Sequence, residues 1–207
     1  MGKRKSSRLW IQARQKDQFY KLAKIQGYRS RASFKLLEVI KRYRFMRPSD
    51  RVVDLGAAPG GWLQATRQTV GDKGFVYGFD LESIEPLPYN NVYVGILDVV
   101  NEGAARIVSS IIQGKVDVVL SDVAPKISGV WEVDHARQIF LARRSLEIAD
   151  HLLRKGGNFF VKLFHGPELR EFRLDVEKVF KNVTLIKPSA SRARSSEVYL
   201  LGTGFLG

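Results

Sequence analysis

Apolar positions follow two different periods along this chain, and the two periods alternate from about residue 50 onward. Short apolar runs rich in valine, isoleucine and phenylalanine have the pattern of buried strands, and the stretches between them repeat apolar positions every three or four residues, as helices do. The predicted strands are residues 52–55, 74–80, 91–96, 116–121, 157–163, 183–187 and 197–202, and the helices among them are 61–70, 101–113, 134–154 and 168–180. This order predicts an α/β fold with a mostly parallel, doubly wound sheet.

The two ends of the chain differ from this alternation. The last two predicted strands are joined by a turn rich in proline, serine and arginine, which is too short for a crossover helix, so we expect this pair to be antiparallel. At the other end, residues 16–25 form a predicted helix that ends near Gly27. A second amphipathic helix follows, with Ser30 or Ser33 as its N-cap and Pro48 as its stop.

Length and composition limit the class of protein. The 207 residues suit one domain with a sizeable core, which we assign to residues 28–207, preceded by a basic RNA-binding arm and helix at residues 1–27. No apolar run approaches the roughly 18 residues of a membrane span, so we expect a cytoplasmic protein with no membrane partner. The chain has no cysteine and its three histidines lack metal-ligand spacing, so neither a disulfide nor a metal site is expected.

The positive charge is concentrated near the N-terminus. Residues 1–47 hold 15 Lys and Arg against two acids, so the entire net charge of +13 lies there, while residues 48–207 carry 19 basic and 19 acidic residues. Aromatic residues are interleaved with the basic ones, a composition typical of a surface that binds a nucleic-acid backbone. A solvated helix face is the plainer interpretation, and the first six residues also match a myristoylation pattern, but the sharp segregation of charge favours RNA.

The most informative segment is Asp54-Leu-Gly-Ala-Ala-Pro-Gly-Gly-Trp62, which joins a buried strand to a helix. Gly56, Gly60 and Gly61 allow a sharp turn in which the backbone approaches a ligand closely, and open α/β sheets bind cofactors at this edge. The segment departs from the dinucleotide fingerprint, because an alanine replaces the second glycine and the proline offers no N–H to a pyrophosphate. An NAD-dependent oxidoreductase is therefore disfavoured.

Further carboxylates follow the next two strands, with Asp80 at the end of one and Asp98 just after the other. Because the carboxyl ends of parallel strands share one edge, we expect these side chains and Asp54 to surround one pocket. An acidic pocket suits a cofactor that carries a positive centre and hydroxyl groups. S-adenosylmethionine fits this description, and Asp80 lies about twenty residues after the glycine turn, where related folds place the acid that binds the ribose.

Two later strands bring candidate catalytic groups to the same edge. Asp122 leaves a buried strand into a proline-bounded loop, and Lys162 lies within an apolar run at the end of another strand. A lysine in such an interior must find a partner or lose its proton. Lys162 could pair with Asp122 merely to hold neighbouring strands together, but lysines are seldom placed in such interiors without a role.

Five segments in this order resemble the signatures of FtsJ/RrmJ-type (RlmE-like) ribosomal RNA 2′-O-methyltransferases, over about residues 28–204. They are Arg29-Ser-Arg-Ala-Ser-Phe-Lys-Leu36, Asp54-Leu-Gly-Ala-Ala-Pro-Gly-Gly-Trp62, Ser121-Asp-Val-Ala-Pro125, Val161-Lys-Leu-Phe164 and Ser191-Arg-Ala-Arg-Ser-Ser-Glu-Val-Tyr199. The resemblance implies a class I S-adenosylmethionine-dependent methyltransferase fold, Rossmann-like, with a mostly parallel seven-stranded sheet whose last strand is antiparallel and which helices flank.

The resemblance also implies roles for individual residues. The catalytic set falls on Lys35, Asp122, Lys162 and Glu197, and contacts with S-adenosylmethionine fall on Gly60, Trp62, Asp80, Asp98 and Asp122. Without the resemblance, Lys35 would be interpreted as a solvent-facing helix lysine and Glu197 as an acid at a strand edge. No metal is required by the implied mechanism.

The implied reaction is methylation of a ribose 2′-hydroxyl in RNA, most closely a uridine of large-subunit ribosomal RNA. DNA lacks this hydroxyl, so RNA is the expected partner. Lys162 would accept the hydroxyl proton in its neutral form, or would orient the hydroxyl as a cation while the proton leaves to a carboxylate or to water. A transfer-RNA ribose 2′-O-methyltransferase of the same superfamily shares these residues, whereas a non-catalytic ribosome-assembly factor would be expected to have lost some of them.

Other residues are candidates for binding the RNA. Arg192 and Arg194, beside Glu197, are candidates for phosphate contacts, and Tyr28 and Phe34 are candidates for base stacking. Phe34 equally suits the core of its helix. We expect the protein to act as a monomer.

Overall fold

The computed structural model describes residues 18–191 and 195–207, which form six helices and a seven-stranded sheet. The strands are β1 (Arg51–Leu55), β2 (Phe75–Asp80), β3 (Val92–Ile96), β4 (Val116–Ser121), β5 (Leu153–Phe164), β6 (Phe180–Ile186) and β7 (Glu197–Phe205). The helices are α2 (Gln18–Ile25), α3 (Ala32–Tyr43), α4 (Gly61–Val70), α5 (Ala104–Ile112), α6 (Trp131–Leu152) and α7 (Leu169–Glu177).

The strand order is β3-β2-β1-β4-β5-β7-β6, and the chain direction changes only at β7. The pairs from β3 across to β5 are parallel, whereas β7 is antiparallel to both of its neighbours, β5 and β6. The predicted doubly wound sheet with an antiparallel last strand is therefore confirmed. The carboxyl ends of β1 to β5 and the start of β7 lie at the same edge.

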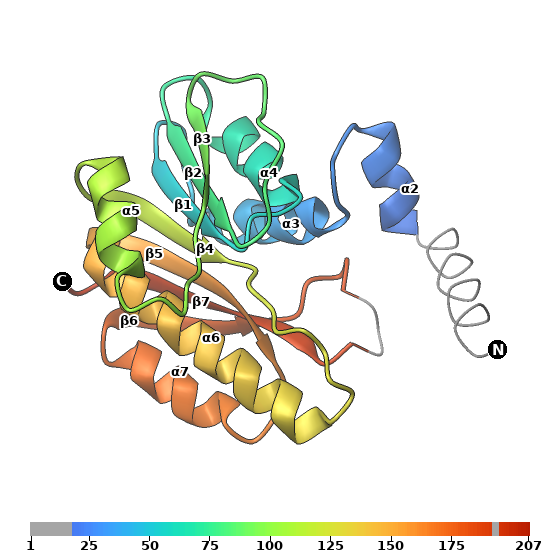
Figure 1. The fold of residues 1–207 in the computed structure, drawn as a ribbon, viewed down its shortest axis with the longest axis vertical. Coiled ribbons are helices and arrows are strands. Elements are labelled where there is room, and N and C mark those ends of the chain that lie inside the picture. Colours follow the sequence, from blue (N-terminus) through green and yellow to red (C-terminus); the bar gives the residue numbers. More distant parts are fainter. Residues whose placement is uncertain (1–17, 192–194) are drawn as a thin grey trace.

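Two apolar clusters, one on each face of the sheet, hold the layers together. Helices α3 and α4 cover one face, and α5, α6 and α7 cover the other (Figure 1). The central strands are buried on both faces, with β1 and β4 formed almost entirely of buried residues. Burial of this kind explains why their sequences are predominantly apolar and do not alternate between apolar and polar positions.

The predicted boundaries of α3 are wrong at both ends. The N-cap is Arg31, which makes no capping bond through its side chain. The Ser33 hydroxyl lies 2.9 Å from the main-chain oxygens of both Ser30 and Gly61 and donates its one hydrogen to either of them. At the other end the helix stops because Arg44 adopts a left-handed conformation, with φ of 49°. The turn is complete before Pro48 is reached.

Helix α6 begins three residues before its predicted start at residue 134. The Asp134 carboxylate accepts the main-chain N–H groups of Ser128 at 2.8 Å and Gly129 at 3.1 Å, and these bonds lower the pKa of Asp134. They fold the preceding loop onto the first turn of the helix. Strand β5 then follows α6 directly, so it begins at Leu153, before the predicted start at 157.

The N-terminal boundary and the membrane prediction can be compared with the structure only in part. Residues 1–17, which carry much of the predicted basic arm, and Arg192 and Arg194 lie outside the described residues. Within the part of the chain that is described, no helix is both long and apolar enough to cross a membrane.

Candidate active site

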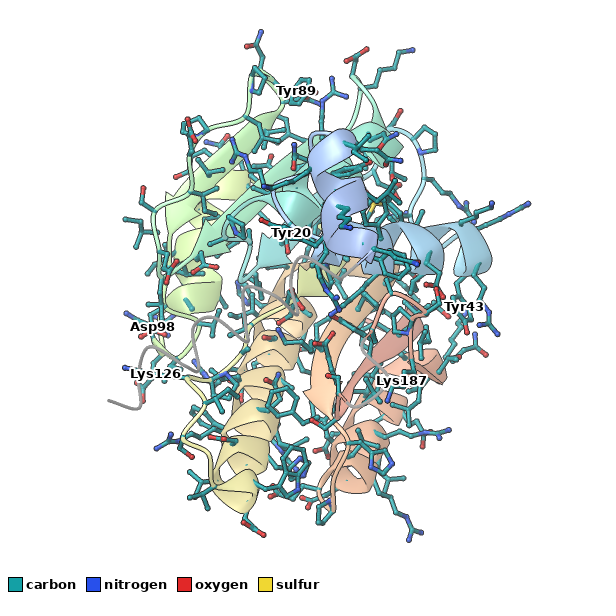
Figure 2. The ribbon with its side chains drawn as sticks, turned by 90° about the vertical axis from the view of Figure 1, so that its right-hand side faces the viewer. Tyr20, Tyr43, Tyr89, Asp98, Lys126 and Lys187 are labelled. Atoms are coloured by element: carbon teal, nitrogen blue, oxygen red, sulfur yellow. The ribbon has the colours of Figure 1, made fainter. Side chains whose placement is uncertain are left out.

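A cavity of about 570 Å³ opens at the carboxyl edge of the sheet. Its lining includes five of the residues predicted to form the site, namely Gly56, Asp80, Asp98, Asp122 and Lys162. Figure 2 faces this edge: Asp98 and Lys126, which both line the cavity, lie on one side, Lys187 lies on the other, and Tyr20 of α2 lies above. The topology thus gathers side chains from four separate strand ends around one space.

Two of the lining carboxylates also organise the loops that carry them. Asp80 accepts the main-chain N–H of Ala58 at 2.9 Å and that of Glu82 at 3.0 Å, which ties the glycine turn to the end of β2. Asp98 accepts the N–H of Val100 at 2.9 Å. A carboxylate has about four acceptor sites, so both side chains can still accept hydroxyl groups from a ligand.

Asp54 lies beneath this edge, and it is not among the residues that line the cavity. The side chain is fully buried in β1, and neither carboxyl oxygen has a hydrogen-bond partner within residues 18–191 and 195–207. Burial raises the pKa of Asp54 well above its usual value, and the charges of Asp122 and Asp80 raise it further. A group that brings positive charge close to this carboxyl would relieve the penalty.

The glycines of the turn after β1 lie against different parts of the protein. Gly56 has φ of 75°, and a Cβ atom there would lie only 2.7 Å from the main-chain nitrogen of Val123, so the loop after β1 passes against the loop after β4. Gly60 and Gly61 instead lie against the segment that precedes α3, and they are outside the cavity lining. Their predicted contact with a cofactor stays a prediction.

Trp62 is likewise outside the cavity lining, and its contacts within the fold are structural. Its indole N–H donates to the main-chain oxygen of Ala32 at 2.9 Å, and its ring stacks on Phe160 with centroids 5.6 Å apart. Phe160 in turn stacks on Tyr199 at 4.9 Å. These three rings pack within one buried apolar cluster beneath the carboxyl edge of the sheet, and a cofactor contact by Trp62 also stays a prediction.

Lys162 and Asp122 form an ion pair at the rim of the cavity. The Nζ atom of Lys162 lies 3.1 Å from Oδ1 of Asp122, and it also donates to the main-chain oxygen of the same residue. Only 8% of Lys162 is exposed. Both contacts tie the end of β5 to the residue that follows β4.

A second ion pair, between Lys35 and Glu197, lies next to the first. Lys35 is only 7% exposed, so its interpretation as a solvent-facing lysine is wrong, because α3 presents this face to β7. Burial alone would raise the pKa of Glu197, but the charge and hydrogen bond of Lys35, with contributions from Tyr199 and Lys162, lower it overall. Glu197 is therefore an ionised acceptor at neutral pH.

Tyr199 connects the two ion pairs, and the sequence analysis assigned it no role. Its hydroxyl lies 2.6 Å from Oε1 of Glu197 and 3.2 Å from Oδ1 of Asp122, and it accepts a hydrogen bond from Lys35 at 3.4 Å. Burial, followed by the two carboxylates, raises the pKa of Tyr199 well above its usual value. The phenol therefore keeps its proton and donates it to one carboxylate at a time.

Gln138 of α6 is a second residue that sequence reasoning missed. Its side-chain amide donates to the main-chain oxygens of Lys162 at 2.9 Å and Val123 at 3.1 Å, so it holds the ends of β4 and β5 at a fixed separation. A period-two pattern along the last strand would have found Tyr199, because residues 197 and 199 share a face. No comparable signal marks Gln138, since a helix position does not reveal which strand ends it meets.

Several basic residues of segment 1–47, and the two aromatic residues predicted to stack on bases, have internal partners. The Arg29 guanidinium donates to the main-chain oxygens of Pro59, Glu85 and Pro86, and Arg31 donates to that of Ala190. The rings of Tyr28 and Phe34 pack edge to face with centroids 5.5 Å apart, and Phe34 also contacts Phe19 of α2. These contacts fasten α2 and the segment before α3 to the body of the protein.

This chain is similar to known proteins along most of its length. The profile of the FtsJ-like methyltransferase family matches residues 28–205. A protein of Methanococcus aeolicus named ribosomal RNA large subunit methyltransferase E is 45% identical over 207 residues, which cover 100% of this chain and 76% of that protein. A protein of the same name from Alkalilimnicola ehrlichii is 45% identical, with 99% of both chains covered.

A solved structure agrees with this likeness. The crystal structure of a Plasmodium falciparum protein assigned as a ribosomal RNA methyltransferase superposes with a TM-score of 0.77 and 26% sequence identity, over 87% of this chain and 100% of that one. The segment that matches the family profile includes the whole sheet, the acidic cavity and both ion pairs. Matches of this extent to the profile and to the relatives establish that this chain belongs to the FtsJ-like methyltransferase family.

Proposed function

We propose that this protein transfers a methyl group from S-adenosylmethionine to a ribose 2′-hydroxyl in RNA, and that the acceptor is a uridine of large-subunit ribosomal RNA. Membership of a methyltransferase family implies S-adenosylmethionine as the donor, and the names of the relatives support the RNA. The observation that carries the proposal is the pair of coupled ion pairs, Lys162–Asp122 and Lys35–Glu197, beside the cavity.

The acidic cavity suits this cofactor. When bound, S-adenosylmethionine supplies a methyl group on a positively charged sulfur. Asp80 and Asp98 are placed to accept hydroxyl groups, and the Asp122 carboxylate offers negative charge to a cation. A cation bound nearby would also favour ionisation of the buried, unpartnered carboxyl of Asp54, whose pKa is raised in its absence. Phosphate groups, by contrast, would be repelled by these carboxylates. The close passage of Gly56 against Val123 leaves main-chain atoms at the floor of this space.

The two lysines then act on the acceptor side. Both donate to carboxylates, which supports their cationic forms and favours the second of the two roles predicted for Lys162. In that role Lys162 orients the hydroxyl oxygen and stabilises negative charge that develops on it. The oxygen–methyl bond forms as the sulfur–methyl bond breaks, and the hydroxyl proton leaves to a carboxylate or to water. Fixed positioning of the hydroxyl supplies much of the rate.

The RNA would be held outside this cavity by the basic N-terminal unit, residues 1–27. Lys21 and Lys24 of α2 are exposed and available for phosphate contacts. Contacts with phosphate groups do not depend on the RNA sequence. The choice of nucleotide must therefore come from the shape of the RNA and from contacts near the catalytic edge. We further propose that one copy of the chain suffices for the reaction.

The test is methyl transfer from labelled S-adenosylmethionine to separated ribosomal subunits, free ribosomal RNA and transfer RNA, with the modified nucleotide mapped. Lys162→Ala is the variant, and Lys155→Ala, an exposed lysine at the opposite end of β5, is the matched control. We expect label in large-subunit RNA with the wild type and the control, and its loss with Lys162→Ala. Calorimetry should show that Lys162→Ala still binds the cofactor.

Each other outcome has a defined meaning. Label in transfer RNA would reassign the substrate while leaving the chemistry in place. Near-normal turnover by Lys162→Ala would remove Lys162 from the mechanism. Cofactor binding without label in any RNA would favour a non-catalytic role.

A further inference from the structure

A partly exposed aromatic surface lies beside the catalytic edge, formed by the exposed Trp131 at the start of α6 and the half-buried Phe164 at the end of β5. The two rings have centroids 6.1 Å apart, and 41% of Trp131 is exposed. Ile127, Val130 and Val133, close to Trp131 in the sequence, have exposed side chains as well. We call Trp131 and Phe164 the aromatic platform. A tryptophan that is exposed to this extent near other exposed apolar side chains marks a binding surface and not a core.

The indole is held rigidly from behind. Its ring stacks on His135, one turn further along α6, with centroids 5.9 Å apart and planes 25° apart. His135 is itself only 2% exposed, accepts the main-chain N–H of Glu168 at 3.2 Å, and packs so closely on Gly166 that a Cβ atom there would lie 2.5 Å from the ring. A rigid, flat surface loses little conformational entropy when it binds a partner.

The platform is continuous with the catalytic edge. Lys126 lines the cavity, and the loop from it leads directly into Trp131. On the other side, Phe164 is the register partner of Glu197 across the antiparallel β5–β7 pair, and such partners have Cβ atoms about 5 Å apart. A nucleic-acid strand advances by about 3.4 Å per nucleotide, so this separation corresponds to between one and two nucleotide steps. A nucleotide next to the methylated one can therefore reach the platform.

The chemistry of the surface selects which part of that nucleotide binds. The first turn of α6 carries the exposed side chain of Glu132, so a phosphate group would meet negative charge there. A nucleobase is flat and uncharged, and it stacks on aromatic rings irrespective of its identity. We propose that the aromatic platform binds an unpaired nucleobase of the RNA substrate that flanks the methylated nucleotide. This inference rests on the proposed function, because the occupant is part of that substrate.

Substitution of Trp131 tests the inference. The variants are Trp131→Ala and the conservative Trp131→Phe, and the matched control is Phe140→Ala, which removes another aromatic ring of α6 that is 49% exposed. Removal of one base stack should raise KM for RNA about 5- to 100-fold in Trp131→Ala, with kcat and cofactor affinity nearly unchanged. Trp131→Phe should recover most of this affinity, and Phe140→Ala should match the wild type.

A second measurement separates stacking from a merely structural role. Binding is measured for a set of RNA oligonucleotides that carry the sequence methylated by the wild type, each with one abasic nucleotide near the target. The wild type should lose affinity at one flanking position, and Trp131→Ala should show no further loss at that same position. An equal abasic penalty in both proteins at every position would overturn the inference, and so would a KM for Trp131→Ala equal to that of Phe140→Ala.

The remaining outcomes are also informative. If Trp131→Ala alters sedimentation of the protein but leaves RNA binding unchanged, the platform is a protein interface and the inference is wrong. If the wild type methylates RNA and only the Trp131 effects are missing, the proposed function stands without the platform. If the wild type transfers no methyl group to any RNA, the proposed function and this inference both fail.

Discussion

The Tyr199 hydroxyl can be removed without disturbing its surroundings, which makes Tyr199→Phe a clean test of how the catalytic edge is held together. The phenylalanine ring retains the stack on Phe160 and the contact with Trp62. What disappears is a proton donated to Glu197 over 2.6 Å and a weak acceptor for Lys35 at 3.4 Å. The longer contact with Asp122, at 3.2 Å, cannot form at the same time, because the phenol has one proton.

The expected loss of stability follows from these contacts. A hydrogen bond to a charged group contributes roughly 1.5–3 kcal/mol. Glu197 keeps its ion pair with Lys35 in the variant, and the deleted hydroxyl no longer has to be desolvated, so we expect about 1–2 kcal/mol of destabilisation at pH 7. Because the bond from Tyr199 helps to lower the pKa of Glu197, the variant should also have a higher Glu197 pKa than the wild type.

The pH dependence has a definite sign. A carboxyl whose pKa is lowered by folding stabilises the protein fully above its unfolded value, here 4.5, and this contribution disappears as the pH falls through the folded pKa. The difference between wild type and Tyr199→Phe should therefore be largest above about pH 4.5 and shrink below it.

Urea unfolding of both proteins from pH 7 down to the lowest pH at which both are folded measures this difference, with Tyr93→Phe on β3 as a control at an exposed site. Equal stability at pH 7, or a difference that does not change with pH, would refute the reasoning.

Three further predictions concern the glycine turn, the buried carboxyl of Asp54 and the binding of RNA. Gly56→Ala should destabilise the fold by more than about 1 kcal/mol and abolish cofactor binding, since the new Cβ meets Val123 while φ stays positive; urea unfolding and calorimetry measure both effects. Asp54→Asn should be more stable than the wild type at pH 7 but not below about pH 3.8, because a raised folded pKa costs stability as the pH rises above the unfolded value; its cofactor affinity should nevertheless fall. In a salt titration of RNA binding, Lys21→Gln with Lys24→Gln should lower the slope of log K against log salt by about 0.7 for each phosphate group that the variant no longer binds, and an unchanged slope would exclude these lysines from the grip.

The sequence predicts the arrangement of strands better than the limits of helices. Strands β1 and β4 are short, predominantly apolar segments between turns, so their positions follow from composition. The ends of α3 depend on contacts that composition does not show. Ser33 bonds to Gly61 of another helix, and Arg44 takes a left-handed conformation that other residue types adopt more often.

The residues of the candidate site also differ in how well the sequence predicts them. Carboxylates at strand ends are visible in the sequence because a parallel sheet collects them at one edge, and Asp80, Asp98 and Asp122 do line one cavity. Burial of Lys35 was not visible, because an amphipathic pattern does not show which strand a helix face meets. Arg29 belongs to the positively charged segment that we interpreted as favouring RNA, but its guanidinium donates hydrogen bonds to main-chain oxygens of two loops.

The reversed direction of β7 explains how this edge acquires its second ion pair. A parallel strand brings only the residues at its carboxyl end to the catalytic edge, whereas β7 arrives with its amino end. Glu197 then lies opposite Phe164, and Tyr199 lies opposite Lys162. Residues two apart on a strand share a face, so a carboxylate and a phenol both point toward the Lys162–Asp122 pair. A shift of one residue in this register would turn both away, so the antiparallel direction of β7 and its register together determine that the two ion pairs lie side by side.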